Sequence, residues 1–550
     1  MDAVRKRLTP QKHELVDVAF GVVLALLGVF GFRTTFSGGE ELLVGVPAVV
    51  LGAALGYVLA KLRAPLLVGV AVSAVVFFVL AGPVALRHRA IAGFLPGPEA
   101  VSAVASGLVN SWIRLLTTLP PAGEAGDLLT VPYFCGFAGG VLTVVLALRL
   151  RRVPLCVVPP TALLVIGVLF GTRRPASLLL QGAVFGALTI AWVSVRHRRA
   201  REITTTAMPR QRVALAVGLV MIAGLGGIVV GPRLPGAGAN DRFVLRDEVE
   251  PPFDPLSEPS ALAAYRNYSD EDVREDDVVT VRGLPQDARL RISVMDDYDD
   301  LVWRATGSGS VLSGEYLRVG ARIPSDGLGD ERRVDVEIHK PHGVWVPLAG
   351  DVTSLDFEGD DAERLTDEVR VSPETDTAAV PGELEAGDRY SFTAEFAPLP
   401  SIEELSKMPL DGRFRRETDA AVPTEFVTQA SEWAGAASSP HAELSAIASV
   451  LRTDGRFSDG GPEANPKSAP GHSLLRLLQF LDNDNPFGNG EQFGAALGLL
   501  AKARGIPVRV VMGLLEPVVL VCRASVVVVA NEAKAGANVN AATFSGAVPF

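Results

Sequence analysis

Cysteine is scarce in this chain, with three residues among 550. Cys135 and Cys156 lie in apolar segments and Cys522 has no obvious mate, so a disulfide framework is excluded and each domain must be stabilised by its own core. Histidine is also rare, at seven residues. The closest pair, His339 and His342, lacks acidic or cysteine partners at ligand spacing, so neither a metal site nor a cofactor is expected.

Residues 233–550 contain no excess of basic over acidic residues. Residues 1–232 contain 21 Lys and Arg against 9 Asp and Glu, whereas residues 233–550 contain 30 against 53. The basic part is also the apolar part, which is typical of a membrane region with positive cytoplasmic loops, and the acidic part is typical of a solvated domain. Nucleic acid is therefore not expected as a partner.

Apolar runs are abundant in residues 1–232, and many have the length that crosses a lipid bilayer, about 20 residues. The first run lacks a convincing small-residue cleavage site and is followed by similar runs, so no cleavable signal peptide is expected. We predict a membrane region at 1–232 with about seven transmembrane helices, at 15–32, 42–60, 66–86, 128–148, 153–170, 176–195 and 213–230.

The charge distribution indicates a cytoplasmic N-terminus. With that orientation 15 of the 21 basic residues face the cytoplasm, as the positive-inside rule requires, and seven crossings place everything after Pro232 outside. Asp17 and Asp127 stand at helix ends, where we expect water, so ionisable groups for transport are missing from the predicted spans. One weak feature favours a transport function, because three prolines could break the fifth predicted helix: Pro154, Pro159 and Pro160.

Two local patterns add detail to the membrane region. Apolar residues recur at three- and four-residue spacing between Val101 and Leu119, which predicts an amphipathic helix with Trp112 at the interface. Glycine pairs four residues apart, Gly52 with Gly56 and Gly182 with Gly186, would let helices approach closely, and packing is their expected role.

Residues 233–400 are predicted to form a mostly β extracytoplasmic domain after a proline-rich lead-in. Apolar and polar residues alternate at 290–294, 334–338 and 390–396, the period of half-buried antiparallel strands. Helical patterns begin after Pro423. One apolar face includes Phe426, and Ser439 with Pro440 forms a cap and first-turn pair that opens a second helix.

The stretch GNGEQFGAALGLLAKARGIPVRVVMG, residues 488–513, has the pattern of a loop, a helix and a strand. Gly505 suits the position just past the helix, and VRVVMG is a short buried strand. A helix is predicted from about Glu491 to Arg504 because its apolar residues share one face: Phe493, Ala496, Leu497 and Leu500.

This stretch resembles the core of the bacterial transglutaminase-like superfamily, whose pattern is G-x-C-x-x-F/Y, a helix, and G-I-P-x-R-x-V-x-G. GIPVRVVMG is the most diagnostic piece, and LLRLLQFL, residues 474–481, is similar to the segment before the family's nucleophile. The apolar segments, SWIRLLTTLPPAGEAGDLL and MDDYDDLVW are similar to membrane-anchored actinobacterial members with a DUF3488-like membrane region. The resemblance implies an α+β, papain-like domain at 401–516 that is incomplete at its C-terminal end.

Active members of the superfamily use a Cys-His-Asp triad for acyl transfer or amide hydrolysis, with the thiol at a helix start that favours the thiolate. The resemblance places the nucleophile at Gly490, which has no side chain. The family histidine follows the cysteine, whereas the last histidine here is His472. In residues 517–550 the expected His-Ala-Trp and Asp are absent, and this atypical tail is either native or truncated or frame-shifted.

Two possible replacements for the missing triad and one possible calcium site are disfavoured. Cys522 with His472 does not follow the family order, and its valine-rich surroundings indicate a buried, unreactive thiol. Glu491 occupies the family's ordinary position after the nucleophile, where helix capping and complementing the helix dipole are its expected roles. Residues 482–491 resemble a calcium loop, but Pro486 and Phe487 occupy the fifth and sixth positions, so a turn-rich loop is expected.

We therefore predict no catalytic residue, and expect a pseudoenzyme of the cell membrane that serves as a non-catalytic cell-envelope scaffold or binding module. The alternative is a cysteine-dependent acyl transferase or peptidase acting on envelope proteins or peptides. By family analogy the partners are envelope proteins or peptides, MoxR-type ATPases and DUF58-type proteins, beside the lipid bilayer. The candidate vestigial cleft comprises Gly488, Asn489, Gly490, Glu491, Gln492 and Phe493.

Overall fold

A computed structural model shows that the chain folds into two compact units. The helical unit comprises Met1–Glu250 with Gly320–Arg322, and the mixed unit comprises Pro251–Val319 with Ile323–Phe550. The structure describes residues 11–36, 39–86, 97–123, 128–150, 153–172, 178–200, 244–249, 253–269, 277–285, 288–306, 315–325, 329–341, 343–397, 422–458, 468–482, 485–515, 523–530 and 542–545.

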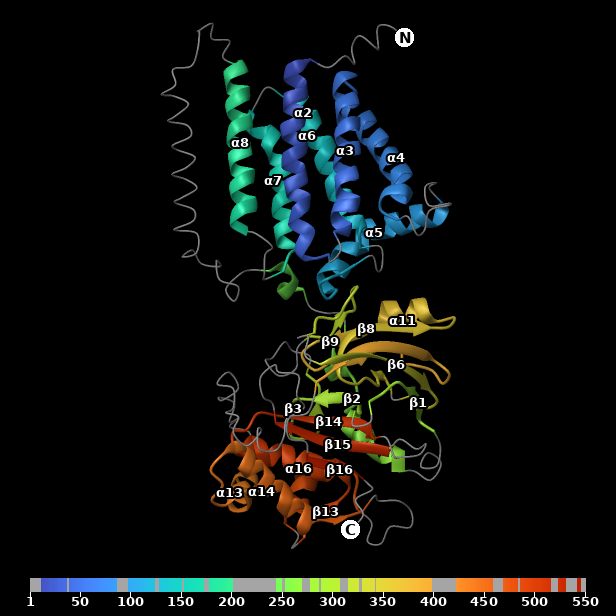
Figure 1. The fold of residues 1–550 in the computed structure, drawn as a ribbon, viewed down its shortest axis with the longest axis vertical. Coiled ribbons are helices and arrows are strands. Elements are labelled where there is room, and N and C mark those ends of the chain that lie inside the picture. Colours follow the sequence, from blue (N-terminus) through green and yellow to red (C-terminus); the bar gives the residue numbers. More distant parts are fainter. Residues whose placement is uncertain are drawn as a thin grey trace. The chain divides into compact units, whose positions relative to one another are not determined.

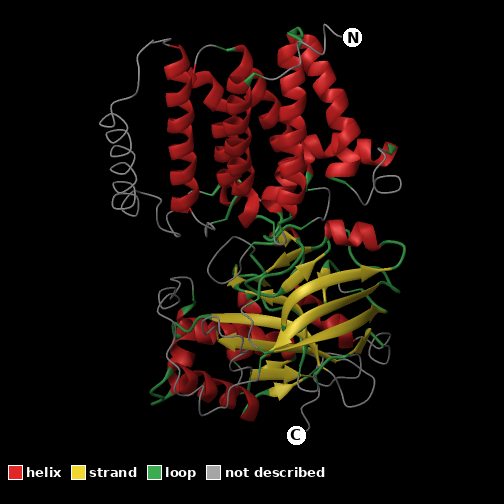
Figure 2. Cartoon of the chain, turned by 45° about the horizontal axis from the view of Figure 1, so that its top comes forward, coloured by secondary structure: helices red, strands yellow, loops and turns green. Residues whose placement is uncertain are grey.

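The helical unit consists of long apolar helices that lie side by side (Figures 1 and 2). Six of the seven predicted apolar segments form helices, and the seventh, at 213–230, lies outside the described residues. Four described helices are long and apolar enough to cross a membrane: Lys12–Thr34, Glu40–Lys61, Leu66–Val84 and Thr130–Arg149. The helices are α2 (Lys12–Val29), α3 (Glu40–Lys61), α4 (Leu66–Val84), α5 (Pro98–Thr117), α6 (Thr130–Arg149), α7 (Val153–Leu169) and α8 (Leu178–Ala200), with short 3₁₀ turns η1 (Phe30–Thr34) and η5 (Leu245–Glu248).

The amphipathic pattern between Val101 and Leu119 is confirmed as α5, whose Trp112 contacts the rings of Phe134 and Phe170. The first glycine pair also behaves as predicted. A Cβ on Gly56 would lie 2.7 Å from the carbonyl oxygen of Val141 on α6, so only glycine permits this approach of α3 to α6. The second pair, on α8, has no neighbouring atom within 4 Å of either added Cβ.

The expectation that Asp17 meets water at a helix end was wrong. Asp17 lies in the second turn of α2 and is 6% exposed. Its carboxylate accepts a hydrogen bond from Trp192 Nε1 at 3.0 Å, and it pairs with Arg196 at 3.0 Å and Arg199 at 3.3 Å, all on α8. A buried carboxylate requires such partners, so this cluster joins α2 to α8. Asp127 lies outside the described residues.

The described residues of the mixed unit form three four-stranded sheets. Their orders are β1-β6-β11-β8, β5-β9-β10-β7 and β16-β15-β14-β2. The predicted alternating segments are confirmed as β2, β6 and β11, and in the second half of β6 the side chains of Val334, Val336 and Ile338 are buried. The strands are β1 (Val279–Arg282), β2 (Leu290–Met295), β3 (Asp297–Tyr298), β4 (Trp303–Arg304), β5 (Leu317–Arg318), β6 (Asp330–Ile338), β7 (Trp345–Val346), β8 (Asp351–Glu358), β9 (Arg370–Ser372), β10 (Thr377–Ala379), β11 (Arg389–Phe396), β12 (Arg456–Phe457), β13 (Phe487–Gly488), β14 (Val508–Leu515), β15 (Arg523–Ala530) and β16 (Ala542–Ser545).

Helices of the mixed unit follow the patterns expected after Pro423. They are α13 (Thr424–Ala434), α14 (Pro440–Thr453), α15 (Leu474–Leu481) and α16 (Gly490–Ala503), and smaller described helical segments precede them: η6 (Pro255–Ser257), η7 (Ala261–Ser269) and α11 (Ala362–Glu368). Ser439 caps α14 by accepting a hydrogen bond from Ala442 N, as predicted. Helix α16 packs on β14 and β15, with α13 and α14 beside it (Figure 1).

One sheet joins segments that the sequence assigned to different domains. Strand β2 pairs antiparallel with β14, with Val510 opposite Met295 and Leu514 opposite Leu290. Strand β2 comes from the predicted β domain at 233–400, and β14 comes from the predicted domain at 401–516. Because strand pairing depends on side chains far apart in sequence, local alternation could not reveal that β2 pairs with β14.

Candidate functional site

The start of α16 is the position where the resemblance places a nucleophile. Asn489 is the N-cap, and its side-chain oxygen accepts a hydrogen bond from Glu491 N at 3.0 Å. The Gln492 Oε1 atom accepts one from Asn489 N at 3.0 Å, which completes a capping box. Gly490 is therefore the first helical residue, where the helix dipole would favour an anion but no side chain is present.

The end of α16 follows the sequence closely. Arg504 is the C-cap and Gly505 follows with a φ of 68°, a left-handed conformation that glycine adopts without strain. The Gly505 N–H donates to Lys502 O at 2.9 Å. The chain then enters β14, which confirms the predicted helix stop and strand.

His472 and Glu491 form a buried pair in which Glu491 belongs to the first turn of α16. The His472 Nδ1 and Glu491 Oε1 atoms are 2.8 Å apart, and the two side chains are 0% and 1% exposed. The other ring nitrogen, Nε2, accepts a hydrogen bond from the backbone N–H of Trp303 at 2.9 Å. Because Nε2 must offer a lone pair, the ring is neutral and its proton resides on Nδ1, from which it is donated to the Glu491 carboxylate.

Glu491 does more than complement the helix dipole. Its Oε2 atom also accepts hydrogen bonds from Gly471 N at 3.3 Å and from Gln492 Nε2 at 3.0 Å. Gln492 Nε2 in turn donates to Gly471 O at 2.7 Å. The capping expected of Glu491 is performed by Asn489 and Gln492, and Glu491 instead fastens the loop at Gly471–His472 to α16.

Trp303 links the MDDYDDLVW segment to this pair. Its indole is fully buried and donates from Nε1 to Ala495 O at 3.3 Å. The ring of Tyr298 packs against it at a tilt of 47°, with ring centroids 5.7 Å apart, and the Tyr298 hydroxyl donates to His472 O at 2.9 Å. A Cβ on Gly498 would lie 2.6 Å from the Trp303 ring. The segment therefore packs on α16, a contact that sequence reasoning missed; its similarity to the family was the available signal.

Arg509, the arginine of GIPVRVVMG, connects two segments of the mixed unit. It donates from Nη1 to Glu374 O at 3.0 Å. Burial lowers the pKa of its guanidinium, and Asp296, Glu374 and Asp376 oppose that effect. Arg509 therefore joins β14 to the loop before β10, and its charge is compensated by neighbouring carboxylates.

The six candidate cleft residues lie close together, but none of them is exposed to solvent. All six residues from Gly488 to Phe493 are buried. The described cysteines, Cys135 and Cys156, belong to the helical unit, and Cys522 lies outside the described residues. No group of side chains suited to a metal ion occurs within the described ranges. Within the part of the chain that the structure describes, both ring nitrogens of His472 are engaged, so this histidine offers no free base at the start of α16.

Residues 18–399 match the family model described as the TgpA N-terminal domain. The chain belongs to this family. The TgpA-family match covers the helical region and the strands up to β11, and it ends before α16. No curated protein matches the chain.

Two solved structures are similar to the chain. One is the periplasmic domain of TgpA from Pseudomonas aeruginosa, at 16% identity and a TM-score of 0.32, covering 53% of this chain and 91% of that one. The other is the same domain bound to ethylmercury, at 14% identity and a TM-score of 0.30, covering 50% and 90%.

Proposed function

We propose that this TgpA-family membrane protein presents its mixed unit outside the cytoplasm as a non-catalytic, transglutaminase-like scaffold or binding module. The observation that supports this most is the start of α16. Gly490 stands at the first helical position, and the adjacent histidine has both ring nitrogens engaged, by Trp303 N and the Glu491 carboxylate. A thiol and a free base are both needed for cysteine-dependent acyl transfer.

The proposed orientation has a cytoplasmic N-terminus and about seven crossings. It is supported by the four membrane-length helices and by the excess of Lys and Arg on the side assigned to the cytoplasm. Membership of an actinobacterial, DUF3488-like subgroup is proposed from the quoted motifs alone. Envelope proteins or peptides, MoxR-type ATPases and DUF58-type proteins are proposed as partners by analogy.

An activity assay separates this proposal from the enzymatic alternative. Purified full-length protein in detergent is assayed for amine incorporation and peptide cleavage, with Cys522→Ser as the matched variant. We expect neither protein to exceed the uncatalysed rate. Turnover that disappears in Cys522→Ser would instead establish a cysteine-dependent acyl transferase or peptidase.

A further inference from the structure

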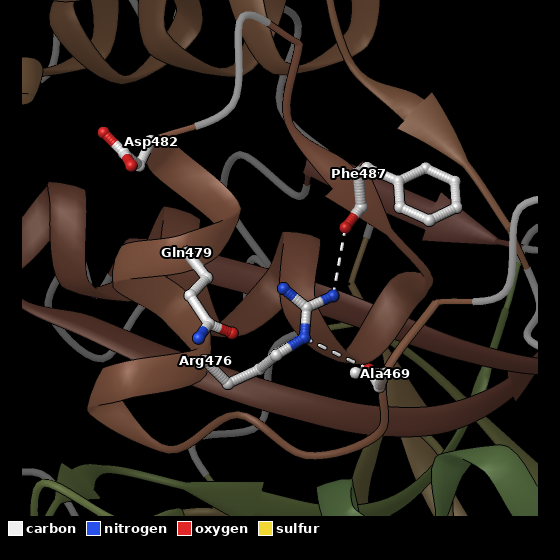
Figure 3. Close-up of a pocket in the computed structure, with 5 residues that line it drawn as sticks. All are labelled: Ala469, Arg476, Gln479, Asp482 and Phe487. Atoms are coloured by element: carbon white, nitrogen blue, oxygen red, sulfur yellow. Dashed lines mark hydrogen bonds between the residues drawn. The ribbon is translucent and has the colours of Figure 1, made fainter.

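Arg476 shows how a charged side chain of this chain is held without an ion pair. It lines a hollow of about 370 Å³ in the mixed unit and has no carboxylate partner within the described ranges. Its guanidinium donates from Nε to Ala469 O at 3.1 Å and from Nη2 to Phe487 O at 3.0 Å (Figure 3). Neutral oxygen atoms therefore serve as the partners of this cation.

Glu41, in the helical unit, lacks partners of either kind. It is the second residue of α3 and is 0% exposed. Among the residues that the structure describes, neither Oε1 nor Oε2 has a hydrogen-bond partner, and the side chain forms no ion pair. An isolated carboxylate ion is very costly to bury, and a group in such a place takes up a proton and becomes neutral instead.

The carboxyl group of Glu41 belongs to the face by which α3 packs on α6. Buried residues of this face recur at three- and four-residue spacing: Glu41, Gly45, Ala48, Gly52 and Gly56. A Cβ on Gly136 of α6 would lie 3.1 Å from Gly45 O, so the two backbones are close one helical turn from Glu41. The span predicted from the sequence begins at Leu42, and Glu41 therefore falls just outside it.

The elements packed on this end of α3 offer little charge to compensate a carboxylate. Arg33 of η1 attracts a negative charge at Glu41, whereas Glu40 repels it. Neither α4 nor the first turn of α6 contains an acidic or basic residue, and Tyr133 of α6 donates its hydroxyl to Phe77 O at 2.6 Å.

The charged residues of α2 lie at the opposite end of α3. There Glu14 pairs with Lys61, the last residue of α3, at 2.9 Å. This pair shows the usual way in which a carboxylate of the helical unit is compensated. Glu41 has no equivalent of Lys61 among the described residues.

We propose that Glu41 is a proton-binding site of the membrane region and that it is occupied at neutral pH. The neutral acid lets α3 keep its close contact with α6, whereas loss of the proton would leave an uncompensated negative charge between the helices. Ionisable residues inside membrane regions are costly and are commonly functional, so occupancy of this site would be coupled to the α3–α6 contact. The inference concerns the helical unit and does not depend on the function proposed for the mixed unit.

Infrared difference spectroscopy of the full-length protein in detergent tests the proposal, because a carboxylic acid has a C=O stretch that a carboxylate lacks. At about pH 7 an ordinary glutamate, with a pKa of about 4.3, is ionised. We expect Glu41→Gln to lose one carboxylic-acid band relative to the parent protein. Glu14→Gln is the matched control and should lose carboxylate bands only, because Glu14 is paired with Lys61.

A second variant keeps the test independent of the folding of Glu41→Gln. Glu41→Asp retains the carboxyl group and should shift the same acid band without removing it. Loss of carboxylate bands in Glu41→Gln, or a shift confined to carboxylate bands in Glu41→Asp, would show that Glu41 is ionised and would overturn the proposal.

Discussion

The two units bury carboxylates in different ways. In the helical unit, Asp17 is compensated by the full charges of Arg196 and Arg199. In the mixed unit, Glu491 is held by neutral donors and by its place in the first turn of α16. Ion pairing joins two helices, whereas neutral hydrogen bonding also fixes the tautomer of His472. The second arrangement stabilises the fold at the start of α16, where the sequence resemblance predicts a nucleophile.

The largest effect is expected from Asp17→Ala in the helical unit. The substitution leaves Arg196, whose side chain is 10% exposed, without its anion. The free energy of unfolding should fall by about 3–5 kcal/mol, the usual cost of breaking a buried pair. Thermal unfolding of the full-length protein in detergent, followed by circular dichroism, measures this. Glu14→Ala is the control because its pair with Lys61 is more exposed; an equal loss in both variants would contradict the comparison.

Glu491→Ala in the mixed unit should have the next largest effect. It removes the acceptor for His472 Nδ1–H and Gly471 N–H, and unsatisfied buried donors cost about 1–3 kcal/mol each. We expect the free energy of local opening to fall by about 2–4 kcal/mol, measured by hydrogen exchange at the Trp303 and Gly471 amides.

Glu491→Gln keeps one acceptor oxygen and should lose about half as much. Glu425→Ala, at an exposed acid in the first turn of α13, is the matched control and should leave both amides protected. Full protection in Glu491→Ala would show that the pair does not hold the Gly471–His472 loop.

These contacts mark the limit of what the sequence could predict. The α5 and α16 helices and the Gly505 stop were predictable because each depends on neighbours within a few residues. Arg196 and Asp17 lie 179 residues apart, and the His472 and Trp303 contact spans 169. No periodicity encodes such pairs, and a histidine beside an acid in space looks like an isolated residue in the sequence. The pairing of β2 with β14 was not predicted for the same reason.

Asp376 offers a smaller, pH-dependent test of the mixed unit. Burial raises the pKa of its carboxyl from 3.8 to about 7; Asp351 adds to this effect, and Arg291 and Arg509 oppose it. Between pH 4 and 7 the unfolded chain has lost the proton while the folded chain keeps it, so the stability conferred by protonation declines as pH rises through this window.

Asp376→Asn should abolish that decline, which we expect to be about 2 kcal/mol because the side chain is partly exposed. Urea unfolding of the full-length protein at several pH values, followed by tryptophan fluorescence, measures the difference. Asp335→Asn, at an exposed acid of β6, should retain the decline. An identical pH profile for Asp376→Asn and the parent would exclude Asp376 as its source.

The smallest effect is expected from the substitution that would restore a thiol at the start of α16. Gly490→Cys, made in a Cys522→Ser background, restores a thiol at the start of α16. Its rate of amine incorporation or peptide cleavage should stay at background, because general-base assistance contributes about 10²–10⁴-fold and both nitrogens of His472 are engaged. Mass spectrometry after alkylation in denaturant verifies the thiol. Turnover that requires His472 would show that the ring can leave Trp303 N and act as a base, and the structural assignment of the pair would then be wrong.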